Sequence, residues 1–393
     1  MKEINSNVHI VGGGLIGLIT AFALSKFKYE IIISEKKKNT DHKKNKNDNR
    51  TTAISQGSKI FLEKLGIWEN LKNHAEPIKC IKVFDRSPKN KLYFHNKESN
   101  ENLGYIIKNS ILIEKLLEKI NKRNSIRLIY GEDINKILYE SNKVVSFSKK
   151  NKCISDIIIA ADGKRSSIRN LYKRTIYSKN YNQKALVITM SHSEDHHNNA
   201  IEFFYKNGPL AVLPMKKNKN KFCSSIVWSN ECDIIDEVFN FSDKDLSSLL
   251  EHQTHFEIGK INKIYTKKSF YLSSHLNSKF YEKRLIYVGD SAHSIHPIAG
   301  QGWNLGVRDI SNMYNLVKKY NSLGIELGNK YFCKDYNSIT FHDAYALYQI
   351  TDKLDGIFKK SNTAMVNLRK FGFNALEKNK FLKSLISDFA MGV

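Results

Sequence analysis

The feature that most constrains this chain is a glycine-rich turn close to its N-terminus. Gly12, Gly14 and Gly17 follow the short β-type run Val8–Val11 and open a helical pattern. In such a turn the first glycine permits a tight bend, the second lets the backbone approach a pyrophosphate, and the third lets the helix pack closely on the strand. The free N–H groups of the helix N-terminus also favour a phosphate. The turn predicts a dinucleotide site, with a purely structural glycine turn as the alternative.

A second apolar strand and an acidic residue complete this pattern. Glu30–Ser34 is nearly all apolar and leads into Glu35, 18 residues beyond Gly17. A strand that is apolar on both faces is typical of a buried parallel sheet. An acid at this position accepts hydrogen bonds from ribose hydroxyls and argues against a 2′-phosphate. These segments together predict a βαβ nucleotide-binding unit.

Buried-type strands recur later in the sequence, with an alternating block between them. Asp156–Ala161 and Leu285–Val288 are apolar strands of the parallel type. The segments between them alternate as antiparallel strands do. These segments are Ala185–Ser191, Ala200–Tyr205, Leu210–Met215 and Phe222–Trp228.

This order of strands predicts an α/β fold in which a sheet domain is inserted into a discontinuous nucleotide-binding domain. Residues 1–77, 98–175 and 276–330 are expected to form the nucleotide-binding domain, 78–97 and 176–275 the inserted domain, and 331–393 C-terminal helices.

Helical periodicity marks the segments around these strands. Ala53–Leu65 is expected to be an amphipathic helix ended by Gly66, and Ser110–Lys122 another. From Asn304 onward the pattern is mostly helical. In Thr363–Phe389 apolar residues are interleaved with basic ones, so this segment either packs on the nucleotide domain or contacts an anionic membrane.

Two further turns at strand ends carry acids. Asp162-Gly163 follows one buried strand, where a carboxylate can anchor a sharp turn, and by itself this is only a strand-to-turn junction. Gly289-Asp290 follows the other, and Asp290 lies where a carboxylate could accept from a hydroxylated ligand chain. Glycines 300, 302 and 306 then present backbone N–H groups at a helix start, which can stabilise negative charge on a ligand.

Two histidines lie close to this last turn. His293 and His296 are three residues apart beside Asp290, so a metal site has to be considered. Pro297 and the glycines favour close contact with a cofactor instead, and a structural role is the default for the histidines. No metal site is therefore predicted.

The chain is strongly basic. It carries 63 Lys and Arg against 39 Asp and Glu, a net charge of +24 in 393 residues. Much of this charge lies in Lys/Asn stretches such as Lys36–Asn49, a solvated loop, and a compositional bias toward Lys, Asn and Ile explains it. Attraction to anionic lipid is a second interpretation. A nucleic-acid partner is not expected, because no zinc-finger, RRM-like or basic-zipper pattern supports one.

Cysteine usage and hydropathy indicate the compartment. The five cysteines are scattered without disulfide or metal spacing, which favours a reducing compartment. Val8–Leu24 is mostly apolar, but it holds four glycines, lacks a basic leader and a cleavage site, and falls short of the roughly 20 residues that a membrane span needs. We expect an unprocessed cytoplasmic protein without a transmembrane helix, with peripheral contact to the inner membrane as an option.

The three strand-end motifs, in this order, resemble those of the class A flavoprotein monooxygenases, which have the fold of 4-hydroxybenzoate hydroxylase. Other segments are similar to one branch of that family, the ubiquinone-biosynthesis hydroxylases of the UbiH/VisC type. These segments are Asp48–Ser55, Leu65–Trp68, Gly208–Pro214, His296–Asp309 and the tripeptide Ala390-Met391-Gly392.

The resemblance implies a Rossmann-like FAD-binding domain with an inserted antiparallel β-sheet substrate domain. It implies that Arg50 lies along the cofactor near the pyrophosphate and flavin, and that the backbone of Ile134 meets the adenine. Asp162 would support the cofactor cleft, and Asp290 would meet the ribityl chain. The ADP half would be held by Gly12, Gly14, Gly17 and Glu35, and the isoalloxazine would be bordered by Pro297, Gly300, Gln301, Gly302 and Asn304. Trp303 departs from the family, where a smaller Leu or Phe is common.

The activity that the resemblance implies is FAD-dependent hydroxylation, with O2, of the aromatic ring of a polyprenylated phenol or quinone precursor in ubiquinone biosynthesis. Electrons would come from NAD(P)H or from a separate reductase, and no second glycine-rich unit exists for a resident nicotinamide. Other ubiquinone-biosynthesis proteins would be partners. The sequence singles out no catalytic acid or base.

Several alternatives stay open beside this activity. The closest is a flavin-dependent hydroxylase of another small aromatic compound. A flavin halogenase of this fold would resemble its relatives through a paired-Trp motif, which this chain lacks. A nicotinamide dehydrogenase would leave Asp162-Gly163 and Gly289-Asp290 unexplained, and a basic binding protein with a vestigial nucleotide fold would be the non-enzymatic case.

Overall fold

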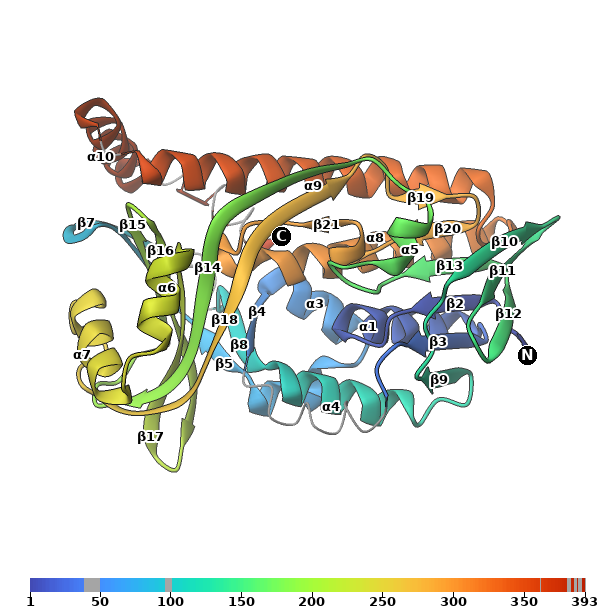
Figure 1. The fold of residues 1–393 in the computed structure, drawn as a ribbon, viewed down its shortest axis with the longest axis horizontal. Helices are drawn as coiled ribbons and strands as arrows, with labels where there is room; N and C mark the ends of the chain where they lie inside the picture. Colours follow the sequence, from blue (N-terminus) through green and yellow to red (C-terminus); the bar gives the residue numbers. More distant parts are fainter. Residues whose placement is uncertain are drawn as a thin grey trace.

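A computed structural model describes residues 1–38, 50–95, 101–360, 362–379, 383–384, 387 and 391–392, without the side chains of 87–90 and 299. Most of the expected loop Lys36–Asn49 lies outside the described residues. So do Asp48, Asn49 and Ala390 of the motifs and part of the expected helical segment Thr363–Phe389. Figure 1 shows an elongated molecule with a sheet at each end and a long helix running between them.

One sheet has the parallel strands that the apolar runs predict. Five strands pair in parallel in the order β20-β13-β2-β3-β9, and β19 adds an antiparallel edge. β2 and β13 are buried throughout, because helices cover one face and a smaller sheet the other. The strands are β2 (Val8–Val11), β3 (Ile31–Glu35), β9 (Ile126–Tyr130), β13 (Ile157–Ala160), β19 (Tyr281–Glu282) and β20 (Leu285–Tyr287).

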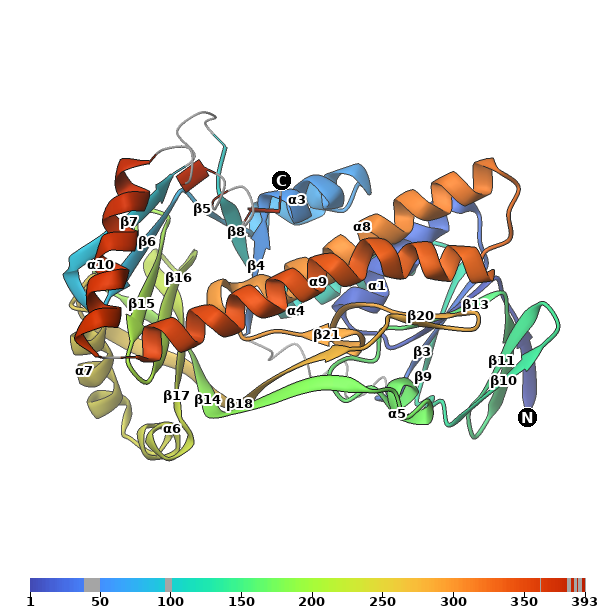
Figure 2. The ribbon, with the colours of Figure 1, turned by 90° about the horizontal axis from the view of Figure 1, so that it is seen from above.

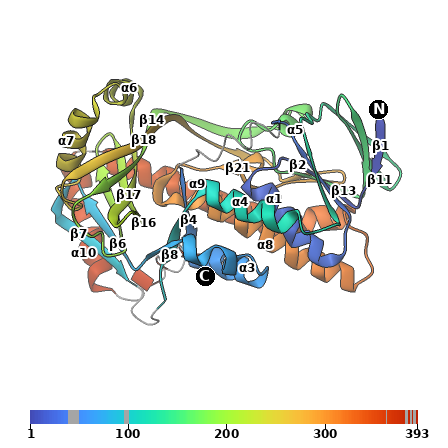
Figure 3. The same ribbon diagram turned by 90° about the horizontal axis from the view of Figure 1, so that it is seen from below.

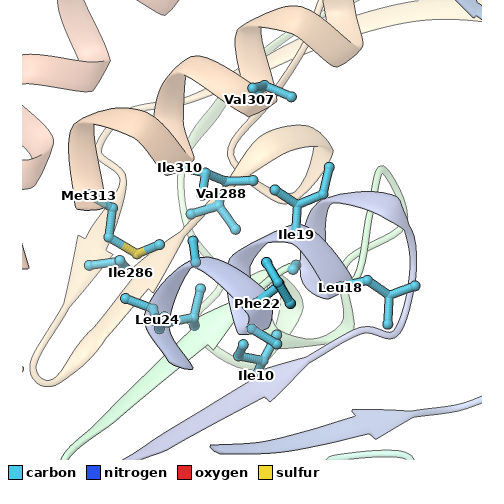
Figure 4. Close-up of a cluster of buried hydrophobic side chains, with 14 of the residues drawn as sticks. Ile10, Leu18, Ile19, Phe22, Leu24, Ile286, Val288, Val307, Ile310 and Met313 are labelled. Atoms are coloured by element: carbon cyan, nitrogen blue, oxygen red, sulfur yellow. The ribbon is translucent and has the colours of Figure 1, made fainter. Parts of the chain in front are cut away.

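Three helices form the main layer on this sheet. α1 (Leu15–Leu24) packs against both α4 (Asn109–Ile120) and α8 (Gln301–Ser322), and eight of its ten residues are buried. Figure 4 shows the core between α1, the sheet and α8, and Figure 3 shows α4 and α1 side by side. This core contains Ile10, Leu18, Ile19, Phe22, Leu24, Ile286, Val288, Val307, Ile310 and Met313.

Two small sheets flank the parallel one. The order β1-β12-β11-β10 covers its far face, and the order β4-β8-β5 lies beside the start of α8. Their strands are β1 (Lys2–Asn5), β10 (Lys136–Glu140), β11 (Lys143–Phe147), β12 (Asn151–Ser155), β4 (Thr51–Ser55), β5 (Glu76–Ile78) and β8 (Gly104–Lys108).

The helix predicted over Ala53–Leu65 begins later than expected. Its first residues pair antiparallel with β8 as strand β4, and the helix is α3 (Gln56–Lys64). Ser55 is extended and caps this helix by accepting from the amide of Ser58. The prediction was wrong at this end because pairing with a distant strand overrode the local helical period. Likewise, α8 begins at Gln301 and not at Asn304.

The other sheet has eight strands in the order β21-β18-β14-β17-β16-β15-β6-β7. All neighbours are antiparallel except β15 and β6. Two of its strands, β14 and β18, are long and reach toward the parallel sheet in Figure 1. The strands are β6 (Cys80–Asp85), β7 (Ser87–His95), β14 (Ile176–His192), β15 (Asn199–Tyr205), β16 (Gly208–Asn218), β17 (Lys221–Glu231), β18 (Ile261–Asn277) and β21 (His293–Ser294).

Helices cover both faces of this eight-stranded sheet. Apolar side chains of α6 (Cys232–Phe239) and α7 (Asp243–Gln253) join one face in a common core. The other face meets α9 (Lys330–Lys359), which lies along α8 in Figure 2, and α10 (Thr363–Lys378) contacts β7. The shorter helices are α5 (Ser167–Leu171), η1 (Ser25–Phe27), η3 (Trp68–Asn70), η4 (Lys72–His74), η5 (Gly289–Ser291) and η6 (Ile298–Gly300). Among the described residues, no helix is long and apolar enough to cross a bilayer.

A buried ion pair fastens α10 to the eight-stranded sheet. The Arg369 Nε lies 2.9 Å from Asp85 Oδ2, and the two side chains are only 2% and 4% exposed. The same guanidinium donates to the carbonyls of Ile357 and Lys360 at the end of α9. Arg369 therefore joins three elements.

Replacing Arg369 by alanine should lower the free energy of unfolding by about 3–5 kcal/mol, because Asp85 would remain buried without its partner. Denaturant unfolding followed by circular dichroism measures this change. The matched control is Lys115→Ala, which breaks the surface pair with Glu118 on α4, whose side chains are 23% and 47% exposed, and should change stability much less. Equal effects of the two substitutions would contradict a structural role for the Arg369 pair.

Candidate functional site

Two glycines of the N-terminal turn are required by close backbone contacts. Gly12 has φ +113°, and a Cβ there would lie 2.3 Å from the Ala161 carbonyl oxygen. A Cβ at Gly17 would lie 1.9 Å from the Gly12 carbonyl oxygen. A larger residue at position 12 would push the turn away from β13, and one at position 17 would push α1 away from the turn. These two glycines therefore determine how closely the elements pack.

Gly14 differs from Gly12 and Gly17 because the position that a Cβ would occupy is open space. It caps the N-terminus of α1 with φ −76°, which every residue type can adopt, and a Cβ there would meet no atom within 4 Å. Protein packing therefore does not demand a glycine at this position. The space lies at the positive end of the helix dipole, where an anionic group is favoured.

Glu35 joins the end of β3 to this turn. Its Oε2 accepts from the Gly13 amide at 2.7 Å, and its Oε1 accepts from the Lys37 amide at 2.9 Å. The side chain is only partly buried. Each carboxylate oxygen keeps a further lone pair, so Glu35 can still accept from ligand hydroxyls while the two amides hold it in place.

Asp162 follows β13 and uses only one of its oxygens within the protein. Its Oδ2 accepts from the Ser167 hydroxyl at 3.1 Å and from the Ile168 amide at 3.2 Å. Its Oδ1 is buried and has no hydrogen-bond partner among the described residues. Because an unpaired buried acceptor is costly, Asp162 Oδ1 is suited to a donor supplied by a ligand or by water.

Asp290 follows β20 at the third strand end. Its side chain is exposed to solvent, yet the protein that surrounds it raises the pKa of its carboxyl above the ordinary value. Asp290 stands at the carboxyl end of β20, and ligands bind at the carboxyl ends of the strands in open α/β sheets.

A buried acid on α8, which the sequence analysis did not select, holds this third turn. Asp309 Oδ2 accepts from the Gly289 amide at 2.8 Å and lies 2.7 Å from His293 Nε2. Burial opposes a charge on His293, but the charge and hydrogen bond of Asp309 outweigh it and raise the pKa of the imidazole. The available signal was an acid inside the apolar face of a helix, five residues beyond Asn304.

The start of α8 is fastened by the Asn304 side chain. Its Oδ1 accepts from the Ser55 amide and the Ser58 hydroxyl, both at 2.9 Å, and its Nδ2 donates to the Ala53 carbonyl at 2.9 Å. Gly300, with φ +61°, makes the bend from η6 into the helix. Asn304 therefore holds the β4–α3 junction against the helix start that carries Gln301 and Gly302.

The remaining site predictions lie around these strand ends. Arg50 precedes β4, and its guanidinium stands 5.7 Å from the centre of the Phe270 ring on β18. Ile134 is 3% exposed and belongs to the main core, in the segment between β9 and β10. Pro297 precedes η6 directly. The preceding His296 is fully buried, and neither ring nitrogen has a hydrogen-bond partner among the described residues.

Comparison with known proteins identifies a cofactor. A family model described as an FAD binding domain matches residues 5–321. Among solved structures, p-nitrophenol 4-monooxygenase PnpA from Pseudomonas putida superposes with a TM-score of 0.79 at 16% identity, covering 100% of this chain and 98% of its own. HpxO from Klebsiella pneumoniae, complexed with FAD and uric acid, superposes with a TM-score of 0.76 at 14% identity and covers 98% and 97%. The fold is that of the class A flavin monooxygenases.

Relatives by sequence extend over almost the whole chain. The ubiquinone hydroxylase UbiL of Rhodospirillum rubrum is 27% identical over 388 residues, covering 98% of this chain and 90% of its own. The mitochondrial ubiquinone biosynthesis monooxygenase COQ6 of Rattus norvegicus is 24% identical, covering 98% and 90%. The ubiquinone hydroxylase UbiM of Neisseria meningitidis is 22% identical, covering 99% and 85%.

Three features of the described residues fit FAD at this site. Open space at Gly14 adjoins a helix N-terminus, as a pyrophosphate needs. Asp162 Oδ1 is a buried acceptor without a donor among the described residues, and the exposed Asp290 carboxylate follows the neighbouring strand. Acceptors at these positions suit the hydroxyls of an extended dinucleotide.

The two glycines beside α1 should respond differently to substitution. Gly14→Val should leave the fold intact and reduce the FAD content after purification, because the added side chain enters only ligand space. Gly17→Ala should lower the melting temperature of the apoprotein, because its Cβ collides with backbone. Flavin absorbance per protein and circular dichroism melts measure the two effects.

Gly372→Val is the matched control for the first substitution. A Cβ at Gly372 on α10 also meets no atom within 4 Å, but this glycine lies outside the site. This variant should retain FAD. Full flavin occupancy in the Gly14→Val protein would remove Gly14 from the pyrophosphate site.

Proposed function

This chain belongs to the FAD-binding monooxygenase family, and we propose that within it the protein hydroxylates the aromatic ring of a polyprenylated phenol in ubiquinone biosynthesis. Three relatives whose names refer to ubiquinone, matched over almost the whole chain, carry the proposal of substrate class. An apolar sheet face that packs against η6 also supports it. Hydroxylation of another small aromatic compound is the alternative that the assay below separates.

Bound FAD supplies oxygen activation with electrons from NAD(P)H, and the chain supplies binding, orientation and electrostatics. We propose that the residues at the three strand ends and at the start of α8 hold it. The backbone N–H groups at the start of α8 would stabilise negative charge on the reduced ring. The proposed residues are Gly12, Gly14, Gly17, Glu35, Arg50, Ile134, Asp162, Asp290, Pro297, Gly300, Gln301, Gly302 and Asn304.

His296 would border this ring as an uncharged group. Burial lowers the pKa of its imidazole to about 4, so it stays neutral throughout the working range of pH. Tyr181 contacts its edge with ring centres 4.6 Å apart, and Asp355 Oδ1 stands 3.8 Å from Nε2. These neighbours fix the orientation of the imidazole while its nitrogens remain available to a ligand or to water.

The substrate side of the site would be the face of the eight-stranded sheet that α9 also contacts. Phe204 on β15, Ile298 in η6 and Phe358 on α9 form one buried cluster there. A second cluster on the same face includes Ala200, with the partly buried Leu213 packed against it. Such a surface suits an aromatic ring with an isoprenoid substituent and excludes water from the reacting atoms.

The assay uses the purified FAD-loaded protein with NAD(P)H, O2 and 2-geranylphenol, a phenol with a short prenyl chain. We expect substrate-dependent NAD(P)H oxidation and a product heavier by one oxygen atom, detected by mass spectrometry. A strain that lacks the protein should accumulate a prenylated quinone precursor in its lipid extract. Turnover of unprenylated phenols alone, with unchanged quinone lipids in the deletion strain, would favour the alternative substrate.

Membrane contact through α10 is a further part of this proposal, because a polyprenylated phenol stays in a bilayer. Leu368 and Phe371 on α10 are 57% and 72% exposed and flank Lys370. The protein should float with vesicles of anionic lipid at low salt and release as salt rises, since each basic residue near the surface contributes about 1 kcal/mol.

Replacing Leu368 and Phe371 by serine should reduce this flotation. The matched control is Tyr331→Ser on α9, which removes a side chain that is also 72% exposed but belongs to another helix. If the double variant floats as well as the unmodified protein, α10 is not the contact.

A further inference from the structure

Glu202 stands on the face of the eight-stranded sheet that is opposite to α6 and α7. Side chains alternate along β15, and its neighbours Ile201 and Phe203 belong to the core under α6 and α7. Ala200, Glu202 and Phe204 therefore point to the opposite face. An acid in the middle of a buried strand, between apolar residues, is unexpected unless it has a partner or a function.

The two neighbours on this face connect Glu202 to the start of α8. Phe204 shares a cluster with Ile298, one residue after Pro297, and its ring stacks on Phe358 with centres 3.8 Å apart. Ala200 belongs to the cluster against which Ala53 packs. A Cβ on Gly300 would stand 3.3 Å from the Ala53 Cβ. Glu202 thus lies between two contacts that both border the η6–α8 bend.

The neighbours of Glu202 across the sheet are apolar. Val83 on β6 and Ala211 on β16 occupy the paired positions. No hydrogen bond or ion pair involves the Glu202 carboxyl among the described residues. Burial alone raises its pKa to about 8, although the side chain is still partly accessible.

The charged groups on the neighbouring elements have partners of their own. Asp85, on the same face of β6, pairs with Arg369 of α10. On α9, Asp355 pairs with Lys359 at 2.7 Å. The imidazole of His296 is neutral, because burial lowers its pKa to about 4. No charged side chain contributes to the pKa of Glu202, so its protonation follows from its own desolvation.

We propose that Glu202 is the catalytic base that accepts the proton of the substrate phenol. This inference rests on the proposed function, because it needs a phenolic substrate between the sheet and the start of α8. A carboxylate in apolar surroundings is a stronger base than one in water, so it is better matched to a phenol.

The step moves one proton. The phenol O–H bond breaks, its electron pair stays on the phenol oxygen, and a new O–H bond forms on a carboxylate oxygen of Glu202. The negative charge on the phenol oxygen raises the electron density of the ring carbons ortho and para to it. The oxygen atom and the electrons of the hydroxylation come from O2 and NAD(P)H, which the flavoenzyme uses already. The proton then passes from Glu202 to solvent, because this side chain is still partly accessible.

The test compares the FAD-loaded Glu202→Gln protein with the unmodified protein, using 2-geranylphenol and NAD(P)H. Glutamine keeps the shape of the side chain but cannot accept the proton. We expect kcat to fall about 100-fold or more, with KM and flavin content nearly unchanged. In the unmodified protein kcat should fall as pH drops below about 8, because Glu202 then holds a proton. This fall is the acid limb of the pH profile, and it should be absent from the variant.

Two further variants separate the base from a structural role. Glu202→Asp keeps a carboxylate and should restore part of kcat together with the acid limb. Glu237→Gln removes an exposed acid on α6, on the far side of the sheet, and should behave as the unmodified protein does.

A readout without turnover tests the same residue. Because the pKa of Glu202 is raised in the folded state, its proton stabilises the fold at low pH, and this stabilisation is lost as pH rises from 4.5 to about 8. The melting temperature of the Glu202→Gln protein should therefore exceed that of the unmodified protein by an amount that grows over this window. Difference infrared spectra should show a carboxyl titrating near pH 8 that is missing in the variant.

The outcomes separate the two proposals. If the unmodified protein hydroxylates 2-geranylphenol but the Glu202→Gln protein keeps its rate and its acid limb, Glu202 is not the base. If Glu202 titrates near pH 8 but no prenylated phenol is turned over, the proposed substrate class fails and the base assignment fails with it. A carboxyl that titrates near its ordinary value would overturn the environment on which the inference depends.

Discussion

Two buried polar side chains on α8 hold the site together. Asn304 satisfies backbone and hydroxyl groups of the β4–α3 junction, and Asp309 satisfies the amide of Gly289 and the ring of His293. Because a buried donor or acceptor without a partner costs free energy, these contacts allow little freedom in the position of the helix start. The turns after β20 and before α3 are therefore fixed relative to the same helix that would face the flavin ring.

The two sheets contribute different chemistry to this site. The parallel sheet ends in acceptors that suit the hydroxyls of FAD, namely Glu35, Asp162 and Asp290. The eight-stranded sheet presents an apolar face, in which Glu202 is the residue that we propose to react. A proton acceptor works best where water is scarce, whereas a dinucleotide needs many polar contacts. Placing the two functions on separate sheets meets both needs.

Much of the fold could be predicted from local sequence. The buried strands Asp156–Ala161 and Leu285–Val288 were confirmed, because a short unbroken run of apolar residues is favourable only where both faces of a strand are covered. The predicted start of a helix at Ala53 was wrong, since Thr51–Ser55 pairs with β8, which lies about 50 residues later in the chain. Asp309 was missed as a site residue because its partners, Gly289 and His293, become its neighbours only when the helix folds back on β20.

The sequence by itself determined the glycine turn, the acids that follow three strands, and the family resemblance, because each depends on residues that are close in the chain. The tertiary structure alone decided the surroundings of Glu202. Val83 and Ala211 come from two distant segments, and only the assembled sheet pairs both of them with Glu202. Desolvation is a property of that assembled environment, so no local pattern could have revealed the raised pKa.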